Sequence, residues 1–199
     1  MSLTMTAQTQ SPLDEVHLAR QAIGSAEAFA ELYRRHVTRV YRYHMAHTGN
    51  VKDAEDLTSQ TFMAALEGIR SYRGEAPFAA WLMGIASRKR ALFFRGTRPE
   101  VQIEAADQIP SPGLLPDQEA GQRLQLESVS RALKRISPDR AEAIILTTFG
   151  GLKYAEAARL LRKSEAAVKM LVSRGLQDLR ERTSLALKMG GPSSKAKYS

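Results

Sequence analysis

The feature that most constrains this chain is an acidic, proline-rich stretch in its middle, residues 96–117, with a net charge of −3. This stretch holds four of the eight prolines, which cannot donate backbone hydrogen bonds and therefore interrupt helices and sheets. The residues before it carry a net charge of +3 and the residues after it +8. We therefore predict two small basic modules joined by a flexible linker, for which 199 residues suffice.

Composition narrows the class of protein. The chain has no cysteine, which excludes disulfides, thiolate zinc sites and cysteine nucleophiles and suits a reducing compartment. No apolar run approaches the ~20 residues needed to span a bilayer, and the first residues lack the apolar core of a secretory signal. We expect a cytoplasmic protein without membrane insertion. A pI near 9.9 makes nucleic acid the first partner to consider and anionic membrane surfaces the second.

Hydrophobic periodicity predicts an all-α fold in both modules. The boundaries that we predict are an N-terminal tail (1–24), a first helical module (25–95), the linker (96–118), a second helical module (119–184) and a disordered basic tail (185–199).

The first module begins with a predicted amphipathic helix over residues 26–48. Ser25 is expected to cap it, Gly49 to end it in the left-handed conformation, and Asn50 to cap a second helix. The second helix has an inward stripe that includes Leu57 and Leu66. Its outer face is acidic, and by itself this pattern is most typical of a solvated face near the positive end of the helix dipole.

A loop over residues 71–78 precedes a third predicted helix, in which Trp81 is expected to pack inward. Four cations follow on that helix with no acid between them, and they repel one another unless an anion lies alongside. Phosphate groups meet that need. The four cations are Arg88, Lys89, Arg90 and Arg95.

The segments AFAELYRRHVTRVYRY, DAEDLTSQTFMAAL and FAAWLMGIAS resemble region two of extracytoplasmic-function (ECF) sigma factors of bacterial RNA polymerase. The resemblance implies that the acidic helix binds core polymerase through Asp53, Asp56, Leu57 and Gln60. It also implies that the loop and the basic helix hold the melted minus-ten promoter element, through Ser71, Tyr72, Arg73, Gly74, Arg88, Lys89 and Arg95.

The second module carries a helix-turn-helix pattern. The helix YAEAARLL is followed by the turn RKS and by EAAVKMLVSRGLQDLRER, which Ser164 is placed to cap. Taken alone, this spacing favours DNA binding only moderately, because many helical hairpins share it.

Residues 119–183 are similar to region four of the same family, which often has glycine where Arg162 stands. The resemblance implies that the second helix of the pair enters the major groove of the minus-thirty-five element. The contacting residues would be Arg162, Lys163, Ser164, Glu165, Ala166, Lys169, Met170, Ser173 and Arg174. Because bidentate arginine reads guanine, Arg174 is the best candidate for base recognition.

These patterns predict a transcription initiation subunit whose partners are core RNA polymerase, promoter DNA and, by resemblance, an anti-sigma factor. We predict no catalytic residues, no cofactor, no metal and no small-molecule substrate. One alternative is a one-component regulator, in which residues 25–95 bind a ligand or dimerise. Another is a metal-dependent enzyme that uses the acids and histidines of the first module, where His44 and His47 are spaced to share a helix face.

Overall fold

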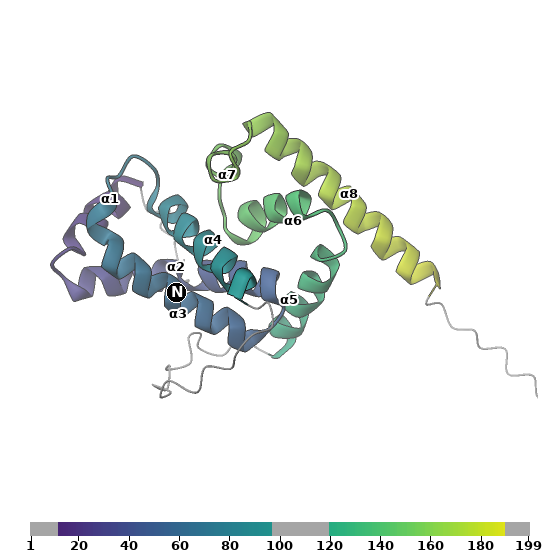
Figure 1. Ribbon diagram of the computed structural model, residues 1–199, viewed down its shortest axis with the longest axis horizontal. Helices are drawn as coiled ribbons and strands as arrows, with labels where there is room; N and C mark the ends of the chain where they lie inside the picture. Colours follow the sequence, from purple (N-terminus) through teal and green to yellow (C-terminus); the bar gives the residue numbers. More distant parts are fainter. Residues whose placement is uncertain (1–11, 97–119, 190–199) are drawn as a thin grey trace, which may run out of the picture.

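The computed structural model describes residues 12–96 and 120–189, and within these ranges the secondary structure is helical without strands. This confirms the predicted all-α class. Figure 1 shows the helices in two groups, one on each side of the interruption at 97–119. The first group is α1 (Pro12–Gln21), α2 (Ala26–Thr48), α3 (Val51–Gly68), a 3₁₀ turn (Ile69–Ser71) and α4 (Phe78–Gly96). The second group is α5 (Ala120–Leu133), α6 (Pro138–Ile144), the π-helical turn η2 (Ile145–Phe149), α7 (Tyr154–Leu161) and α8 (Glu165–Met189).

Local signals set the ends of α2 and α3 as predicted. The Ser25 hydroxyl accepts a hydrogen bond from the backbone N–H of Ala28. Gly49 ends α2 with φ 68°, a left-handed conformation that glycine adopts without a steric penalty. The Asn50 side chain then accepts from the backbone N–H of Asp53 at 3.0 Å. The α2 stop, Gly49, and the α3 cap, Asn50, are thus adjacent residues, so the connection between the two helices is short.

The helix α2 is the centre of the molecule. It contacts α1, α3 and α4 on its own side of the chain and α5 and η2 of the second group. Its second half is buried almost all round, as shown by Val40, Tyr41, Tyr43 and Met45, each at most 1% exposed. Full burial of such a side chain stabilises the fold by about 1.5–3 kcal/mol. The two modules share this core, because one cluster of buried residues contains side chains from both.

The predicted tail over residues 1–24 is wrong for its second half, where residues 12–21 form α1. Ala19 and Ala22 are buried at 1% and 5% exposure against the first module. Val16 lies next to Gly74, where an added Cβ would be 3.0 Å from its Cγ1. A ten-residue helix is marginal alone and is stabilised here by packing, and small alanines give little periodic signal in the sequence. Residues 1–11 lie outside the described part of the chain.

In the second module α6 begins at Pro138, and η2 is followed by two glycines. In η2 the N–H of Gly150 reaches back to the carbonyl of Ile145 at 2.8 Å, an extra residue per turn that the sequence did not indicate. Helices α6 and α8 approach closely at Gly175, where an added Cβ would lie 2.7 Å from Cδ1 of Ile144. Helix α8 continues to Met189, so the predicted tail over 185–199 begins at least five residues too early.

The predicted linker, residues 96–118, lies outside the described residues apart from Gly96, the last residue of α4. None of the helices in the described ranges is long and apolar enough to cross a membrane.

Candidate functional site

The outward side of α3 is the first candidate surface. Asp56 and Gln60 are exposed on it, and Asp53 is half-buried in the first turn, beside the Asn50 cap. Leu57, predicted to contact a partner, is instead 1% exposed on the inward side of the helix. It supports this surface from beneath and is not part of it. Leu57 is buried because it is hydrophobic and belongs to the inward stripe of α3.

Two large apolar side chains are exposed to solvent on the same helix. Met63 is 64% exposed and Leu66 is 51% exposed, although periodicity placed Leu66 in the inward stripe. Met63 follows Gln60 by three residues, so it lies on the same face of the helix as that residue. An acidic rim beside exposed Met and Leu side chains is typical of a protein-binding surface. The signal in the sequence was a large apolar residue at position 63, outside the buried stripe.

The second candidate surface is the loop before α4, and side-chain contacts give it a fixed shape. The Tyr72 hydroxyl donates to the carbonyl of Ala76 at 2.8 Å, and the Tyr72 ring centroid lies 5.4 Å from those of both Phe78 and Trp81. Ser71 donates to the carbonyl of Gly68 at 2.7 Å. Gly74 has φ 77°, and Arg73 is exposed. Tyr72 therefore shapes the loop, whereas Arg73 is available to a ligand.

A cavity of about 310 Å³ lies between α3 and α4, next to this loop. Its volume is at the lower end of the ~300–1,000 Å³ typical of ligand pockets. Trp81 packs against the core, as predicted, and also lines this cavity. The other lining residues are Ala64, Gly68, Ser71, Ile85, Arg88, Lys89 and Leu92. An aromatic wall and two cations are suited to a flat anionic ligand such as an unstacked nucleotide.

The four cations of α4 do not act together. Arg88 and Arg95 are exposed, and Lys89 is half-buried at the cavity. Arg90 points to the opposite side, where its Nη1 lies 2.9 Å from Oε2 of Glu142 in α6. The expectation that phosphate groups would lie beside all four cations is therefore wrong for Arg90, which pairs with Glu142. Its partner is 52 positions away, so no local pattern revealed it.

The helix-turn-helix forms as the sequence predicted. Ser164 caps α8 by accepting from the N–H of Ala167 at 3.1 Å, and Val168 and Val172 anchor the inner side of α8 at 0% and 6% exposure. All nine predicted contact residues are exposed on the turn and on the outer side of α8. Arg162 occupies the left-handed region with φ 53°, the only non-glycine residue to have a positive φ in the described ranges.

Ion pairs order the outer side of α8 and its turn. Lys169 lies 2.7 Å from Glu165 one turn earlier, and its Nζ stands 5.8 Å from the ring centroid of Tyr154, at the start of α7. The hydrogen bond that Lys169 donates to the Glu165 carboxylate raises the pKa of Lys169 above its usual value. Lys163 pairs with Asp139 of α6 at 3.0 Å. Tyr154 was missed by the sequence analysis, because its role depends on a contact between two helices.

Comparison with known proteins matches both modules to one family. Residues 32–98 match the family model of Sigma-70 region 2, and residues 126–179 match that of Sigma-70, region 4. The chain belongs to the sigma-70 family, in its ECF group. The module before the helix-turn-helix is therefore region 2, which does not favour the one-component regulator.

Individual relatives agree with this assignment. The sigma factor is 33% identical over 164 residues to the ECF RNA polymerase sigma factor BldN of Streptomyces coelicolor, a match that covers 80% of this chain and 62% of BldN. It is 29% identical to the RNA polymerase sigma factor NccH of Alcaligenes xylosoxydans xylosoxydans, over 83% of this chain and 92% of NccH. The solved structure of CnrH in complex with the cytosolic domain of CnrY has a TM-score of 0.67 at 26% identity, and the match covers 86% of this chain and 97% of CnrH.

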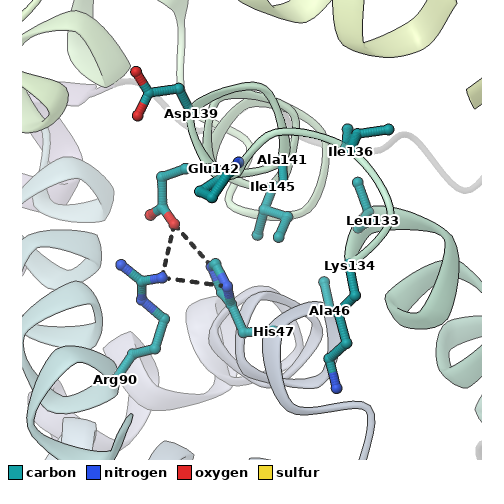
Figure 2. A pocket seen from close by; sticks show the side chains of 11 residues that line it. Ala46, His47, Arg90, Leu133, Lys134, Ile136, Asp139, Ala141, Glu142 and Ile145 are labelled. Atoms are coloured by element: carbon teal, nitrogen blue, oxygen red, sulfur yellow. Dashed lines mark hydrogen bonds and ion pairs between the residues drawn. The ribbon is translucent and has the colours of Figure 1, made fainter. Parts of the chain in front are cut away.

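Regions 2 and 4 of this sigma factor meet at a buried polar cluster, which we call the Glu142 cluster: Glu142, Arg90, Tyr43 and His47. Figure 2 shows Glu142 of α6 pointing toward Arg90 of α4 and His47 of α2. The Tyr43 hydroxyl donates to Oε1 of Glu142 at 3.2 Å, and Arg90 pairs with Oε2 at 2.9 Å. His47 Nε2 lies 3.4 Å from Oε2, too poorly aligned for a strong hydrogen bond. A cavity of about 390 Å³ adjoins the cluster.

Burial sets the protonation of this cluster. It raises the pKa of Glu142, and the positive charge of Arg90 partly offsets that rise by favouring the carboxylate. Burial also lowers the pKa of His47 well below 6.5, and Arg90 lowers it further. Arg90 Nη1 lies 3.4 Å from Nδ1 of His47 and can only donate, so Nδ1 accepts and the ring proton is on Nε2, facing Glu142.

The remaining histidines of α2 are buried by packing. His44 Nε2 lies 3.0 Å from the Thr61 hydroxyl of α3, and burial, assisted by Arg90, lowers the pKa of His44 to about 3. His36 lies 3.1 Å from Glu15 of α1, and the hydrogen bond from His36 helps to lower the pKa of that carboxyl. His44 and His47 therefore contact different helices. Among the described residues, no group of three His, Cys, Asp or Glu side chains is placed to hold a metal ion.

Proposed function

We propose that this sigma factor binds core bacterial RNA polymerase through the exposed face of α3 and directs the enzyme to promoters. Asp53, Asp56 and Gln60 provide the polar contacts, and Met63 and Leu66 provide apolar area beside them. The match with BldN covers less than two thirds of that relative, so the proposal rests on the surfaces of this chain. The carrying observation is that three surfaces of suitable chemistry are exposed on one chain: an acidic–apolar helix, a cationic cavity and a helix-turn-helix.

In region 2, the loop at 71–74 and the cavity beside it hold the melted minus-ten strand. Extruding a base from the duplex costs a few kcal/mol, which stacking and neutralisation of phosphates must offset. Trp81 offers the stacking wall, and Arg88 and Lys89 line the same cavity. Arg95 continues the cationic path one to two turns farther along α4. Arg90 has no part in this path, because it points to the opposite side of α4 and does not line the cavity.

In region 4, the N-terminal half of α8 enters the major groove of the minus-thirty-five element. Arg174 reads a base edge, for which bidentate pairing with guanine is worth about 1–3 kcal/mol of discrimination. Arg162 and Lys163 in the turn contact phosphates and fix the position of the helix. Ser164, with its hydroxyl engaged in the cap of α8, acts mainly by holding the start of the helix.

A transcription assay tests the proposal. Core polymerase without its own sigma factor is mixed with the protein and a pool of random duplexes joined to a reporter segment, and the transcripts are sequenced. We expect discrete start sites preceded by two shared sequence elements. The Asp53→Lys/Asp56→Lys variant should lose these starts, whereas Glu181→Lys, a single charge reversal on an exposed acid of α8, should keep them. Transcription that does not respond to the protein, or tight binding to a palindromic duplex without polymerase, would contradict the proposal.

The sigma factor contributes binding surfaces and supplies no catalytic group to the reaction of polymerase. We propose that it acts in the cytoplasm, where bacterial polymerase works, and that an anti-sigma protein sequesters it. The structure of CnrH with the cytosolic domain of CnrY supports the second part of this proposal by analogy. Co-purification with a regulatory protein that blocks capture of core polymerase is the expected result.

A further inference from the structure

Another cavity, of about 730 Å³, lies outside the surfaces described so far, and we call it the arginine cavity. Residues of α2, α5 and η2 line it, together with the glycine turn that follows η2. Its volume is within the ~300–1,000 Å³ typical of ligand sites. Arg42 and Thr148 line it and are exposed, so a ligand can enter from solvent.

Three arginines of α2 give this cavity its charge. Arg35, Arg39 and Arg42 are separated by four and three residues, so they share one face of the helix. None of the described residues that line the cavity is acidic. Three guanidinium groups on one helix face repel one another, and an anion between them would relieve this repulsion.

Ion pairs with the rest of the chain neutralise these arginines only in part. Glu31 lies 2.8 Å from Nε of Arg35, yet Nη1 of Arg35 is buried and has no hydrogen-bond partner among the described residues. In the part of the chain that the structure describes, Arg39 and Arg42 have no carboxylate within 4.0 Å. Two of the three arginines are therefore available to an anion from solution.

Glu15 of α1 is the other acid whose charge reaches this site. Its hydrogen bond with His36 is the main cause of its lowered pKa, and the charges of Arg39 and Arg35 lower that pKa further. Glu15 does not line the cavity, and its direct partner is His36 at 3.1 Å. The three arginines outnumber the two nearby acids, so the site keeps a positive charge.

The glycine turn after η2 holds the Arg39 guanidinium in place. An added Cβ at Gly151 would lie 3.1 Å from Nε and 3.4 Å from Nη2 of Arg39, so the guanidinium packs against the backbone of this turn. Gly151 has φ 61°, which also favours glycine at this position. A cation that is already positioned loses less conformational entropy when a ligand binds.

The lining residues indicate the chemistry of the ligand. A guanidinium fork binds phosphate through two parallel N–H···O bonds, and Arg35 and Arg42 are about 10.5 Å apart along the helix, so linked phosphate groups can contact several forks at once. Phe149 adds an aromatic face, and Gln125 and Thr148 add hydrogen-bonding groups. Arginine stays protonated at neutral pH, so these groups hold an anion without transferring a proton.

We propose that the arginine cavity binds a small ligand with two or three linked phosphate groups, as in a nucleoside triphosphate or inorganic tripolyphosphate. This site goes beyond the proposed function, because neither α3, nor the loop before α4, nor α8 contributes to its lining. A nucleic-acid strand fits it less well, since a strand carries one phosphate per nucleotide and brings fewer charges into the same volume.

Calorimetric titration of the full chain with ATP, and separately with inorganic tripolyphosphate, tests the site. At about 150 mM salt the Debye length is ~8 Å, which weakens general attraction to a basic surface. We expect saturable binding of one ligand per chain and at least tenfold weaker binding of AMP. Tighter binding of ATP than of tripolyphosphate would assign the ligand as a nucleotide, and the reverse order as an inorganic chain. No saturable binding of either up to about 5 mM, or equal binding of AMP, would overturn the inference.

Variants of α2 locate the site. Arg39→Gln should weaken the binding of tripolyphosphate at least tenfold, and Arg39→Lys should weaken it less, because lysine keeps the charge but not the fork. Arg34→Gln removes the same charge from an exposed position of α2 outside the cavity and should leave the affinity within twofold. Equal losses in Arg34→Gln and Arg39→Gln would show general attraction to a basic protein and would contradict the proposal.

A second variant leaves the arginines intact. Thr148 is exposed, so Thr148→Glu should fold normally while its carboxylate pairs with the arginines and repels phosphate, weakening binding at least tenfold. Ser128→Glu, on an exposed position of α5 outside the cavity, should leave the affinity within twofold, and thermal unfolding of each variant without ligand checks the fold. A single-stranded oligonucleotide that loses as much affinity as ATP in Thr148→Glu would make the cavity a nucleic-acid contact and would refute the proposal. These titrations contain no polymerase, so their outcome is independent of the proposed function.

Discussion

Helices α3 and α8 are both amphipathic and both lie on the surface, yet they expose opposite chemistry. The outer side of α3 has Asp56 and Gln60 beside exposed Met63 and Leu66. The outer side of α8 has Lys169, Ser173 and Arg174, and over residues 165–182 its exposed large apolar residues are Met170 and Leu176. The inner sides are alike in being apolar. The class of partner therefore follows from the exposed side of each helix, and the predictions below test this difference.

The largest effect is expected for reversal of charge on α3. Asp53→Lys/Asp56→Lys should weaken capture of core polymerase by at least a hundredfold, because like charges then replace the complementary ones at the centre of the docking face. Capture on immobilised polymerase measures this, and thermal unfolding should show a preserved fold. Undiminished capture would mean that α3 is an ordinary solvated helix.

A comparison between the two sides of α3 comes next. Leu57→Ala should lower the free energy of unfolding by about 3 kcal/mol, because it leaves a cavity in a fully buried site. Met63→Ser should leave the free energy of unfolding within about 0.5 kcal/mol and weaken polymerase capture instead. Denaturant titration and the capture assay together separate the two roles. Loss of stability in Met63→Ser would show that this side chain is structural.

On α8, the corresponding prediction concerns sequence specificity. Arg174→Ala should weaken recognition of the minus-thirty-five element by about 1–3 kcal/mol at a single base position. Sequencing of transcripts from a randomised upstream element measures the change in preference. A uniform loss over all sequences would make Arg174 a phosphate contact.

Acid should weaken the attachment of α3 to α2 through His44. Folded His44 remains neutral down to a pKa of about 3, whereas the unfolded chain takes up a proton near pH 6.5. Because the unfolded state binds more protons, stability is lost as the pH falls from about 6.5 toward 3, and roughly 2 kcal/mol should be lost by pH 5. Denaturant titrations at pH 7 and pH 5 test this, with His44→Gln as the less pH-dependent comparison. His47 acts in the same direction, so the variant should reduce the slope without abolishing it.

The smallest effect is expected at the start of α8. Arg162 is held at φ 53°, which glycine adopts more readily than any other residue. Arg162→Gly should therefore raise the free energy of unfolding by up to about 1 kcal/mol, while it weakens DNA binding by removal of a cation. Thermal unfolding and a duplex-binding assay give the two readings. A loss of stability would indicate that the arginine side chain makes a contact that outweighs its backbone strain.

Local signals made most helices predictable. Ser25, Gly49, Asn50 and Ser164 each fixed a helix end as expected, because a cap is specified by one residue and its near neighbours. The outer side of α8 followed from the helix-turn-helix pattern and from the resemblance to region four. Helix α1 was not predicted from the sequence, because its buried residues are mainly small alanines.

Interactions between distant segments were the part that the sequence did not reveal. Arg90 looked like one of four equivalent cations, and only the fold places it against Glu142. The exposure of Leu66 likewise depends on where α4 ends its contact with α3, which a helical period does not determine. A shared core between regions 2 and 4 requires complementary shapes on helices far apart along the chain.

The exposed face of α3 has a consequence for the sequence of events in transcription. This face is exposed while regions 2 and 4 are packed on each other, so under the proposed function polymerase can take hold of the protein through α3 in this arrangement. Without polymerase, a chain with a net charge of +8 would bind chromosomal DNA non-specifically. Under the proposed function, promoters are therefore read only by copies of the sigma factor that are already bound to polymerase.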